Sequence, residues 1–283
     1  MSENQGKKAR RDEARERARA AREKAQARRR RNRTLTISGI IVGGLAVVSA
    51  IVLVIANSVA PAGPGPRNMA SDGILLHGVS GKIEAVRTAA IPEGGKPTAT
   101  KQDDSVANIT LYTDYMCPYC NQFETAQMAQ IKQWVEDGSA TLELHPFNLL
   151  DSSSLGSKYS TRSAAAAACV ANSDPDDFLA FNSSLYENQP SEGTRGLTND
   201  KLVSLAKAAG ATSPTVADCI TSQKFAGWVA DATNRVLNDK LPNSSLDKLT
   251  GTPTVIVNGK QYTGSLTDTD AFAAFVLQNG GKA

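Results

Sequence analysis

The hydrophobic pattern from about residue 106 onward predicts a strand, a helix and a second strand. Apolar and polar side chains alternate along residues 108–115 (NITLYTDY) and again along 141–149 (TLELHPFNL). A repeat of two is typical of a half-buried strand. Between these runs, apolar side chains recur at the spacing of one helix face, at Met128, Ile131, Trp134 and Val135. This region therefore predicts a strand–helix–strand unit.

The pattern of the next hundred residues is helical. We expect helices over 163–171, from Asp174 onward, over 199–209 before Gly210, and over 225–236. At the far end, residues 252–264 predict a hairpin around Asn258-Gly259, and residues 268–277 predict a closing helix. The whole is an α/β arrangement in which a helical insertion, about residues 152–245, separates the two strand-containing units.

A different pattern precedes this region, because residues 35–56 (LTISGIIVGGLAVVSAIVLVIA) are almost wholly apolar. A helix of this length would measure about 33 Å, enough to cross a hydrocarbon core of about 30 Å. A buried core helix is the alternative, but a helix of this length without a polar face is uncommon. The apolar run and the segment before it are too long for a cleaved signal peptide. We therefore predict one transmembrane signal anchor, over residues 34–57.

Charge gives this span an orientation. Residues 1–33 contain 14 basic and 5 acidic side chains, a net charge of +9; because the whole chain carries +3, the remainder carries −6. Basic residues beside a first membrane helix stay in the cytoplasm, so we predict a cytoplasmic tail and an extracytoplasmic domain in a single-pass cell-membrane protein. A nucleic-acid-binding arm is the alternative reading of the tail, but beside a span we expect no nucleic-acid partner. Residues 58–70 predict a linker, and residues 71–283 the folded domain.

Cys117 and Cys120 lie between the first predicted strand and its helix. A metal site usually needs four ligands, and outside the span the chain adds only His77, His145, Cys169 and Cys219, with no second close pair. We therefore expect no metal and no other cofactor. An inert disulfide across two residues is possible, but so tight a loop gains little chain-entropy stabilisation. A reactive pair is the favoured interpretation.

The chemistry of thiol exchange explains the spacing. A cysteine in the first turn of a helix has its thiolate stabilised by unpaired N–H groups and by the helix dipole. Cys120 follows one turn later, where it can attack a mixed disulfide formed at Cys117 and release the bound partner. Pro118 suits the first helical position because its missing N–H would have no partner there.

YTDYMCPYCNQFE, followed about 130 residues later by GTPTVIVNGKQYTG, resembles the DsbA-type thioredoxin-fold oxidoreductases. The resemblance runs from about Val106 to the C-terminus. It implies a thioredoxin fold with an inserted helical domain, here preceded by one transmembrane helix. It also implies that the Thr252–Pro253 bond is cis and faces the cysteines, leaving the Thr252 backbone free to align a substrate. The alternative is a trans proline that starts an edge strand.

Two further residues could modulate the cysteines. Asp114 is the one acid near the pair; it could tune the thiols, cap the loop or face solvent. Tyr119 cannot exchange thiols, so we expect it to modulate the redox poise or to form part of the substrate surface. Some thioredoxin-fold enzymes carry a buried carboxylate in the strand before the site, but the corresponding position here is Leu111.

Cys169 and Cys219 lie in the predicted helical insertion. In an oxidising compartment a structural disulfide between them is the expected pairing, and two buried free thiols are the alternative. His77 and His145 have no motif around them, so we expect surface residues or satisfied core residues.

The resemblance implies a membrane-anchored thiol–disulfide oxidoreductase that introduces disulfides into exported, cysteine-containing proteins. The chain is similar to membrane-anchored actinobacterial members of this family. The resemblance also implies a vitamin K epoxide reductase homologue or a DsbB-like protein as the membrane redox partner. We expect a monomer. An isomerase is less favoured, because isomerases of this superfamily usually carry an added dimerisation domain, and the roughly 40 residues between the linker and Val106 are too few for one. The alternatives are a reductase or isomerase of the same fold, a supplier of reductant for cytochrome maturation, and a redox-idle binding module or chaperone.

Overall fold

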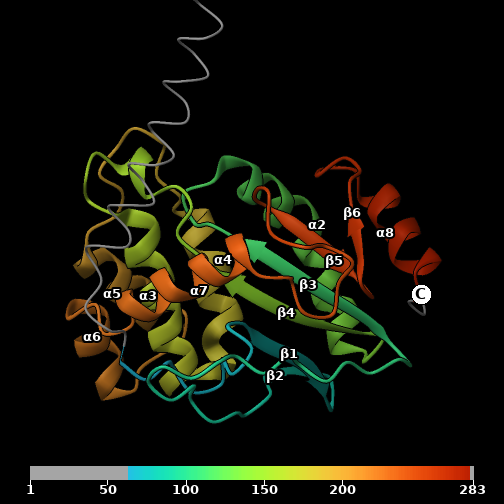
Figure 1. Ribbon diagram of the computed structural model, residues 1–283, viewed down its shortest axis with the longest axis horizontal. Coiled ribbons are helices and arrows are strands. Elements are labelled where there is room, and N and C mark those ends of the chain that lie inside the picture. Colours follow the sequence, from blue (N-terminus) through green and yellow to red (C-terminus); the bar gives the residue numbers. More distant parts are fainter. Residues whose placement is uncertain (1–62, 281–283) are drawn as a thin grey trace, which may run out of the picture. The chain divides into compact units, whose positions relative to one another are not determined.

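A computed structural model describes residues 63–280, which contain one six-stranded sheet in the order β2-β1-β4-β3-β5-β6 (Figure 1). The strands are β1 (Ile74–Val79), β2 (Lys82–Ala85), β3 (Ala107–Thr113), β4 (Ala140–Pro146), β5 (Thr254–Val257) and β6 (Lys260–Tyr262). β3 runs parallel to β4, whereas β5 lies antiparallel to β3 and forms a hairpin with β6. The strand–helix–strand unit and the hairpin that the sequence pattern predicts are both confirmed.

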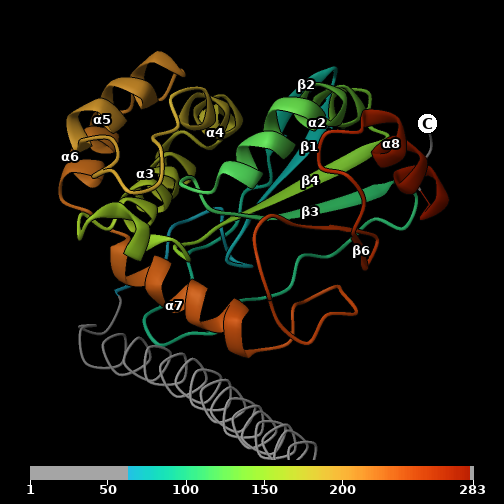
Figure 2. The same cartoon turned by 90° about the horizontal axis from the view of Figure 1, so that it is seen from above.

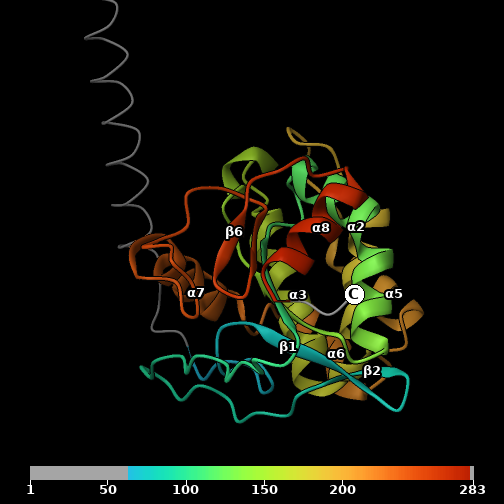
Figure 3. The ribbon, with the colours of Figure 1, turned by 90° about the vertical axis from the view of Figure 1, so that its right-hand side faces the viewer.

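Helices cover both faces of the sheet (Figures 2 and 3). On one face α2 (Pro118–Glu136) and α8 (Thr269–Gln278) pack with Phe123 against Phe272, their ring centroids 5.3 Å apart. On the other face α7 (Ala226–Asn238) contributes Val236 to a second apolar cluster with Tyr112 and Ile256. The alternation of β3 places Leu111 in the first core and its neighbour Tyr112 in the second.

Between β4 and β5 the chain forms the helical insertion, whose centre is the Ala-rich helix α3 (Tyr159–Ser173). Every residue of α3 from Ser163 to Ala171 is buried. A helix that is apolar all round belongs inside a bundle, and its small side chains let neighbours approach closely. It contacts its neighbours α4 (Phe178–Glu187), α5 (Asn199–Ala208), α6 (Pro214–Thr221) and α7. Two short 3-10 helices, η1 (Asp151–Ser154) and η2 (Pro175–Asp177), complete the insertion.

The hairpin of β1 and β2 is absent from the sequence prediction. Its segment, ILLHGV, does not alternate, and Gly78 within it reads as a strand breaker. The structure explains this glycine: a Cβ at residue 78 would lie 2.1 Å from the carbonyl oxygen of Val135. Only glycine lets β1 pass so close to the end of α2.

The folded domain also begins earlier than the predicted boundary at residue 71. Within the segment expected to be a linker, Met69 is fully buried, and Asn68 donates a hydrogen bond from Nδ2 to the carbonyl oxygen of Ala171 at 2.8 Å. The Gly65 N–H donates to the carbonyl oxygen of Ile91 at 2.8 Å. The composition of residues 58–70 gave no sign of these contacts, because isolated groups make them and no apolar repeat accompanies them.

Within residues 63–280, no helix has the length and apolar character needed to cross a membrane. The predicted tail at residues 1–33 and the predicted span at 34–57 lie outside the described residues.

Candidate functional site

Cys117 is the N-cap residue of α2, and Pro118 occupies the first helical position. β3 ends at Thr113, and a tight turn follows in which the Cys117 N–H donates to the carbonyl oxygen of Asp114 at 3.0 Å. No acidic side chain lies in the first turn of α2, and no side-chain oxygen caps it. The free N–H groups of this helix end are therefore directed at the Cys117 sulfur.

The segment before β5 lies across from the cysteines. The Thr252–Pro253 bond is cis. The Cys117 thiol donates to the carbonyl oxygen of Thr252 at 3.5 Å, and the Thr252 hydroxyl lies 2.8 Å from the Cys120 sulfur. The structure thus brings together the residues predicted to be catalytic, although Thr252 and Cys117 are 135 residues apart in sequence.

The two thiols differ in their acidity. A hydrogen bond from Cys120, together with the N–H groups of Cys120 and Tyr119, holds the pKa of the Cys117 thiol below its usual value, although burial and the Asp114 carboxylate oppose this. Burial raises the pKa of Cys120 well above its usual value, and the neighbouring Cys117 adds to the effect. Cys117 is therefore the more acidic thiol of the pair, and Cys120 holds its proton more tightly.

Asp114 does not face solvent, which removes one of its three predicted roles. It is completely buried, and its carboxylate accepts hydrogen bonds from the backbone N–H groups of Met116 and Leu150, each at 2.8 Å, and from the Ser160 hydroxyl at 2.7 Å. Burial nevertheless raises the pKa of Asp114 to about 6. The side chain fixes the loop that carries Cys117 to the loop after β4.

Glu124, one helical turn after Cys120 on α2, is a buried carboxyl that the sequence analysis did not identify. Its Oε1 accepts hydrogen bonds from Asn182 at 3.0 Å and Ser183 at 3.1 Å, and its Oε2 has no hydrogen-bond partner. Burial raises the pKa of Glu124 to about 7. Asn182 also accepts a hydrogen bond from the hydroxyl of Tyr115, at 3.0 Å. A group that can hold a proton at neutral pH therefore lies beside the active-site loop.

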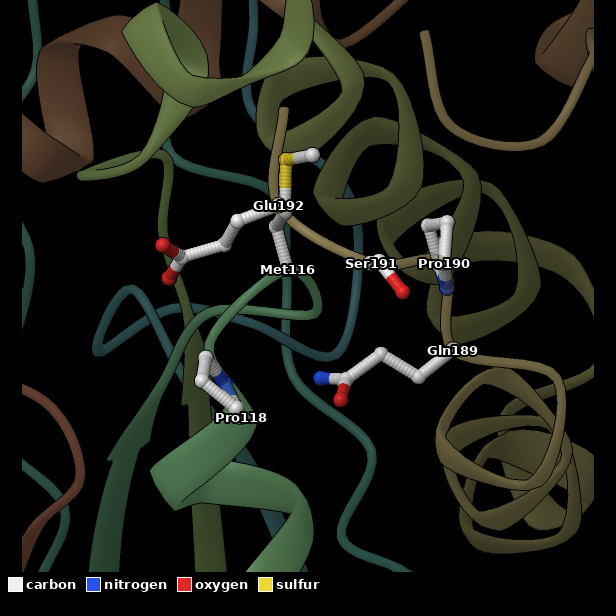
Figure 4. A pocket seen from close by; sticks show the side chains of 6 residues that line it. All are labelled: Met116, Pro118, Gln189, Pro190, Ser191 and Glu192. Carbon is white, nitrogen blue, oxygen red and sulfur yellow. The ribbon is translucent and has the colours of Figure 1, made fainter. Parts of the chain in front are cut away.

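Gln189, in the loop after α4, is a second residue missing from the sequence analysis. Its amide Nε2 donates to the carbonyl oxygens of Cys117 at 2.9 Å and Tyr115 at 3.2 Å, and its Oε1 accepts from Asn121. Gln189 also lines a pocket beside the cysteines (Figure 4). A polar residue in a loop carries no sequence signal for such a contact, because its partners lie about 70 residues away.

The remaining predicted residues lie in clearly different environments. Tyr119 is 59% exposed, next to the buried Cys117 and Cys120. Cys169 on α3 and Cys219 on α6 form a disulfide within the helical insertion. His145 is a core residue, but it is not a satisfied one: neither ring nitrogen makes a hydrogen bond, and Nε2 lies 3.5 Å from Oε1 of Glu143.

Comparison with known proteins gives matches over most of the described residues. A family model described as thioredoxin matches residues 101–276. The reduced DsbA of Mycobacterium tuberculosis superposes with a TM-score of 0.57 and 27% identity, covering 75% of this chain and 93% of that one.

The curated proteins that match in sequence include a disulfide bond formation protein and a protein kinase. Disulfide bond formation protein D of Bacillus subtilis is 29% identical over 168 residues, which is 59% of this chain and 69% of that protein. The serine/threonine-protein kinase PknE of M. tuberculosis is 35% identical over 118 residues, which is 40% of this chain. The match covers only 21% of the length of that kinase.

Proposed function

The chain belongs to the thioredoxin family, and from this membership we propose that it is a DsbA-type thiol–disulfide oxidoreductase that introduces disulfides into exported proteins. The observation that carries the proposal is the asymmetry of the pair. Cys117 has a lowered pKa at a helix N-terminus, and Cys120 has a raised pKa behind it. Both face the Thr252–Pro253 segment.

The reaction begins with Cys117 and Cys120 joined as a disulfide. A substrate thiolate attacks the Cys117 sulfur, the bond to Cys120 breaks, and its electron pair stays on Cys120, which takes up a proton. A second substrate thiolate then attacks the substrate sulfur of the mixed disulfide, and Cys117 leaves as a thiolate. The substrate has lost two electrons and the enzyme has gained them. A low pKa of Cys117 favours this last step because a more stable thiolate is a better leaving group.

The surrounding residues support this sequence of steps. We assign to Thr252 and Pro253 the alignment of the substrate chain beside Cys117, because the Thr252 carbonyl lies against the reacting thiol. Pro118 starts α2 without an unpaired N–H, and the exposed Tyr119 offers an aromatic surface to the substrate. Asp114 acts as a positioning residue through its bonds to Met116 and Leu150.

The proposal includes a location and partners. Residues 35–56 anchor the protein, residues 1–33 stay in the cytoplasm, and the catalytic domain lies outside as a monomer. A membrane protein of the vitamin K epoxide reductase or DsbB-like class then reoxidises Cys117 and Cys120. The basic tail beside an uncharged apolar run supports this topology, and the disulfide bond formation protein among the relatives supports the reaction.

Trapping tests the proposed function. In Cys120→Ser protein the resolving thiol is gone, so mixed disulfides with exported proteins should accumulate through Cys117 and disappear on reduction. Cys117→Ser should give none. Absence of adducts in the Cys120→Ser protein, with the domain folded, would remove the assignment of Cys117 as the exchanging thiol.

A further inference from the structure

We infer that the pocket beside Cys117 binds a lysine or arginine side chain of the substrate, next to the reacting cysteine, and that Glu192 selects this side chain. The inference rests on the proposed function and names the substrate feature that the same site recognises.

The pocket has a volume of about 250 Å³, several times the roughly 30 Å³ that one water occupies in the liquid. In Figure 4 the side chains of Gln189 and Glu192 extend from the loop after α4, and Met116 and Pro118 come from the loop before α2 and from the start of that helix. The lining residues are Met116, Pro118, Gln189, Pro190, Ser191 and Glu192. This space is large enough for one long side chain.

The chemistry of the lining matches a cationic side chain with an apolar stem. Met116, Pro118 and Pro190 supply apolar surface, and Glu192 supplies a carboxylate. Lysine and arginine place their methylene stems on apolar surface and keep the charged head beside polar groups. An acidic substrate residue would meet the Glu192 charge without compensation, and an apolar residue would leave that charge unpaired.

Glu192 is exposed and available for such a pair. Among residues 63–280 the salt bridges use the acids Asp176, Glu143 and Asp72, and none of them involves Glu192. The Glu192 carboxylate therefore forms no salt bridge within the described part of the chain.

The pocket lies beside the reacting cysteine, Cys117. Met116 and Pro118 are the sequence neighbours of Cys117. On the opposite wall, Gln189 donates its amide hydrogens to the carbonyl oxygens of Cys117 and Tyr115, at 2.9 and 3.2 Å. A side chain bound here consequently belongs to a substrate residue close to the sulfur that attacks Cys117.

The test uses the oxidised full-length protein and three reduced peptides of equal length, with Arg, Gln or Glu beside a single cysteine. The second-order rate constant for loss of the Cys117–Cys120 disulfide is measured by acid quench and mass spectrometry. Each constant is divided by that of the same peptide with oxidised glutathione, because a neighbouring charge also changes the pKa of the peptide thiol. The variants are Glu192→Gln and, as a matched control, Glu187→Gln, an exposed acid at the end of α4 that does not line the pocket.

We expect the wild type and Glu187→Gln to prefer the Arg peptide to the Glu peptide, and Glu192→Gln to lose about two- to five-fold of that preference, the range for one exposed ion pair. Added salt should weaken the wild-type preference in the same way. Equal normalised preferences in the wild type and Glu192→Gln would overturn the subsite while leaving the proposed function intact. Failure to oxidise any of the three peptides would instead count against the proposed function.

Discussion

Replacing Glu124 by Gln is expected to stabilise the protein at alkaline pH while leaving its stability in acid unchanged. The carboxyl is buried between α2 and α4, where Asn182 and Ser183 donate hydrogen bonds to it. Lys132, about two turns further along α2, donates to Ser183 and acts on the Glu124 carboxylate through its charge. Glu187 on α4 opposes ionisation. A glutamine keeps the shape and one acceptor oxygen, but it cannot ionise.

The size of the effect follows from the pKa of Glu124, which burial raises from 4.5 to about 7. A raised folded-state pKa contributes stability that is fully present below the unfolded value and is lost as the pH rises through the folded one. Because one pKa unit corresponds to about 1.4 kcal/mol, ionisation should cost the wild type about 2 kcal/mol between pH 5 and pH 8. Glu124→Gln should not incur this cost.

Urea denaturation of both proteins from pH 4.5 to 8.5 measures the difference in free energy of unfolding. The difference isolates Glu124, since the buried Asp114, whose pKa is about 6, titrates in both proteins. Glu136→Gln, at an exposed acid on the same helix, is the control and should show no pH-dependent difference. If Glu124→Gln and wild type kept a constant difference across the range, or if the variant were less stable at pH 8, the assigned ionisation would be wrong.

Two further changes test other buried interactions, each by chemical denaturation. Arg235→Met should destabilise the protein by about 3 kcal/mol, because it leaves the buried Asp72 carboxylate without the cation that binds it at 2.6 and 2.7 Å. Arg87→Met, which breaks an exposed ion pair, should cost less than about 1 kcal/mol, and equal losses would refute the distinction. Replacing Cys169 and Cys219 together by Ala opens a loop of 50 residues and should cost about 4 kcal/mol by the chain-entropy relation; an unchanged denaturation midpoint would contradict it.

Local sequence determined the parts of the fold that were predicted correctly. The turn between β5 and β6 requires positive φ at both residues, and Asn258 and Gly259 adopt 44° and 81°. The start of α2 could also be predicted from nearby residues, because Cys117 and Pro118 lie where the alternation of β3 stops. By contrast, β1 passes the end of α2 at Gly78, a contact made only after the chain folds back.

The candidate site divides in the same way. Cys117 and Cys120 are visible from their spacing alone. Glu124 and Gln189 are not, because each becomes part of the site only through partners 58 to 74 residues away. Asp114 shows the intermediate case, since its position was evident but its burial depends on Leu150 and Ser160. A polar side chain has no periodic signal that separates burial from exposure, so tertiary contacts decide.

The reduction potential of the Cys117–Cys120 pair tests the central claim most directly. Equilibration of the purified protein with glutathione buffers of defined ratio, followed by alkylation of free thiols and mass spectrometry, gives this potential. Stabilisation of the Cys117 thiolate favours the reduced form, so the value should be more oxidising than the roughly −270 mV of thioredoxin. A value at or below that of thioredoxin, together with rapid reduction of protein disulfides, would contradict an enzyme that introduces disulfides and would identify a reductase instead.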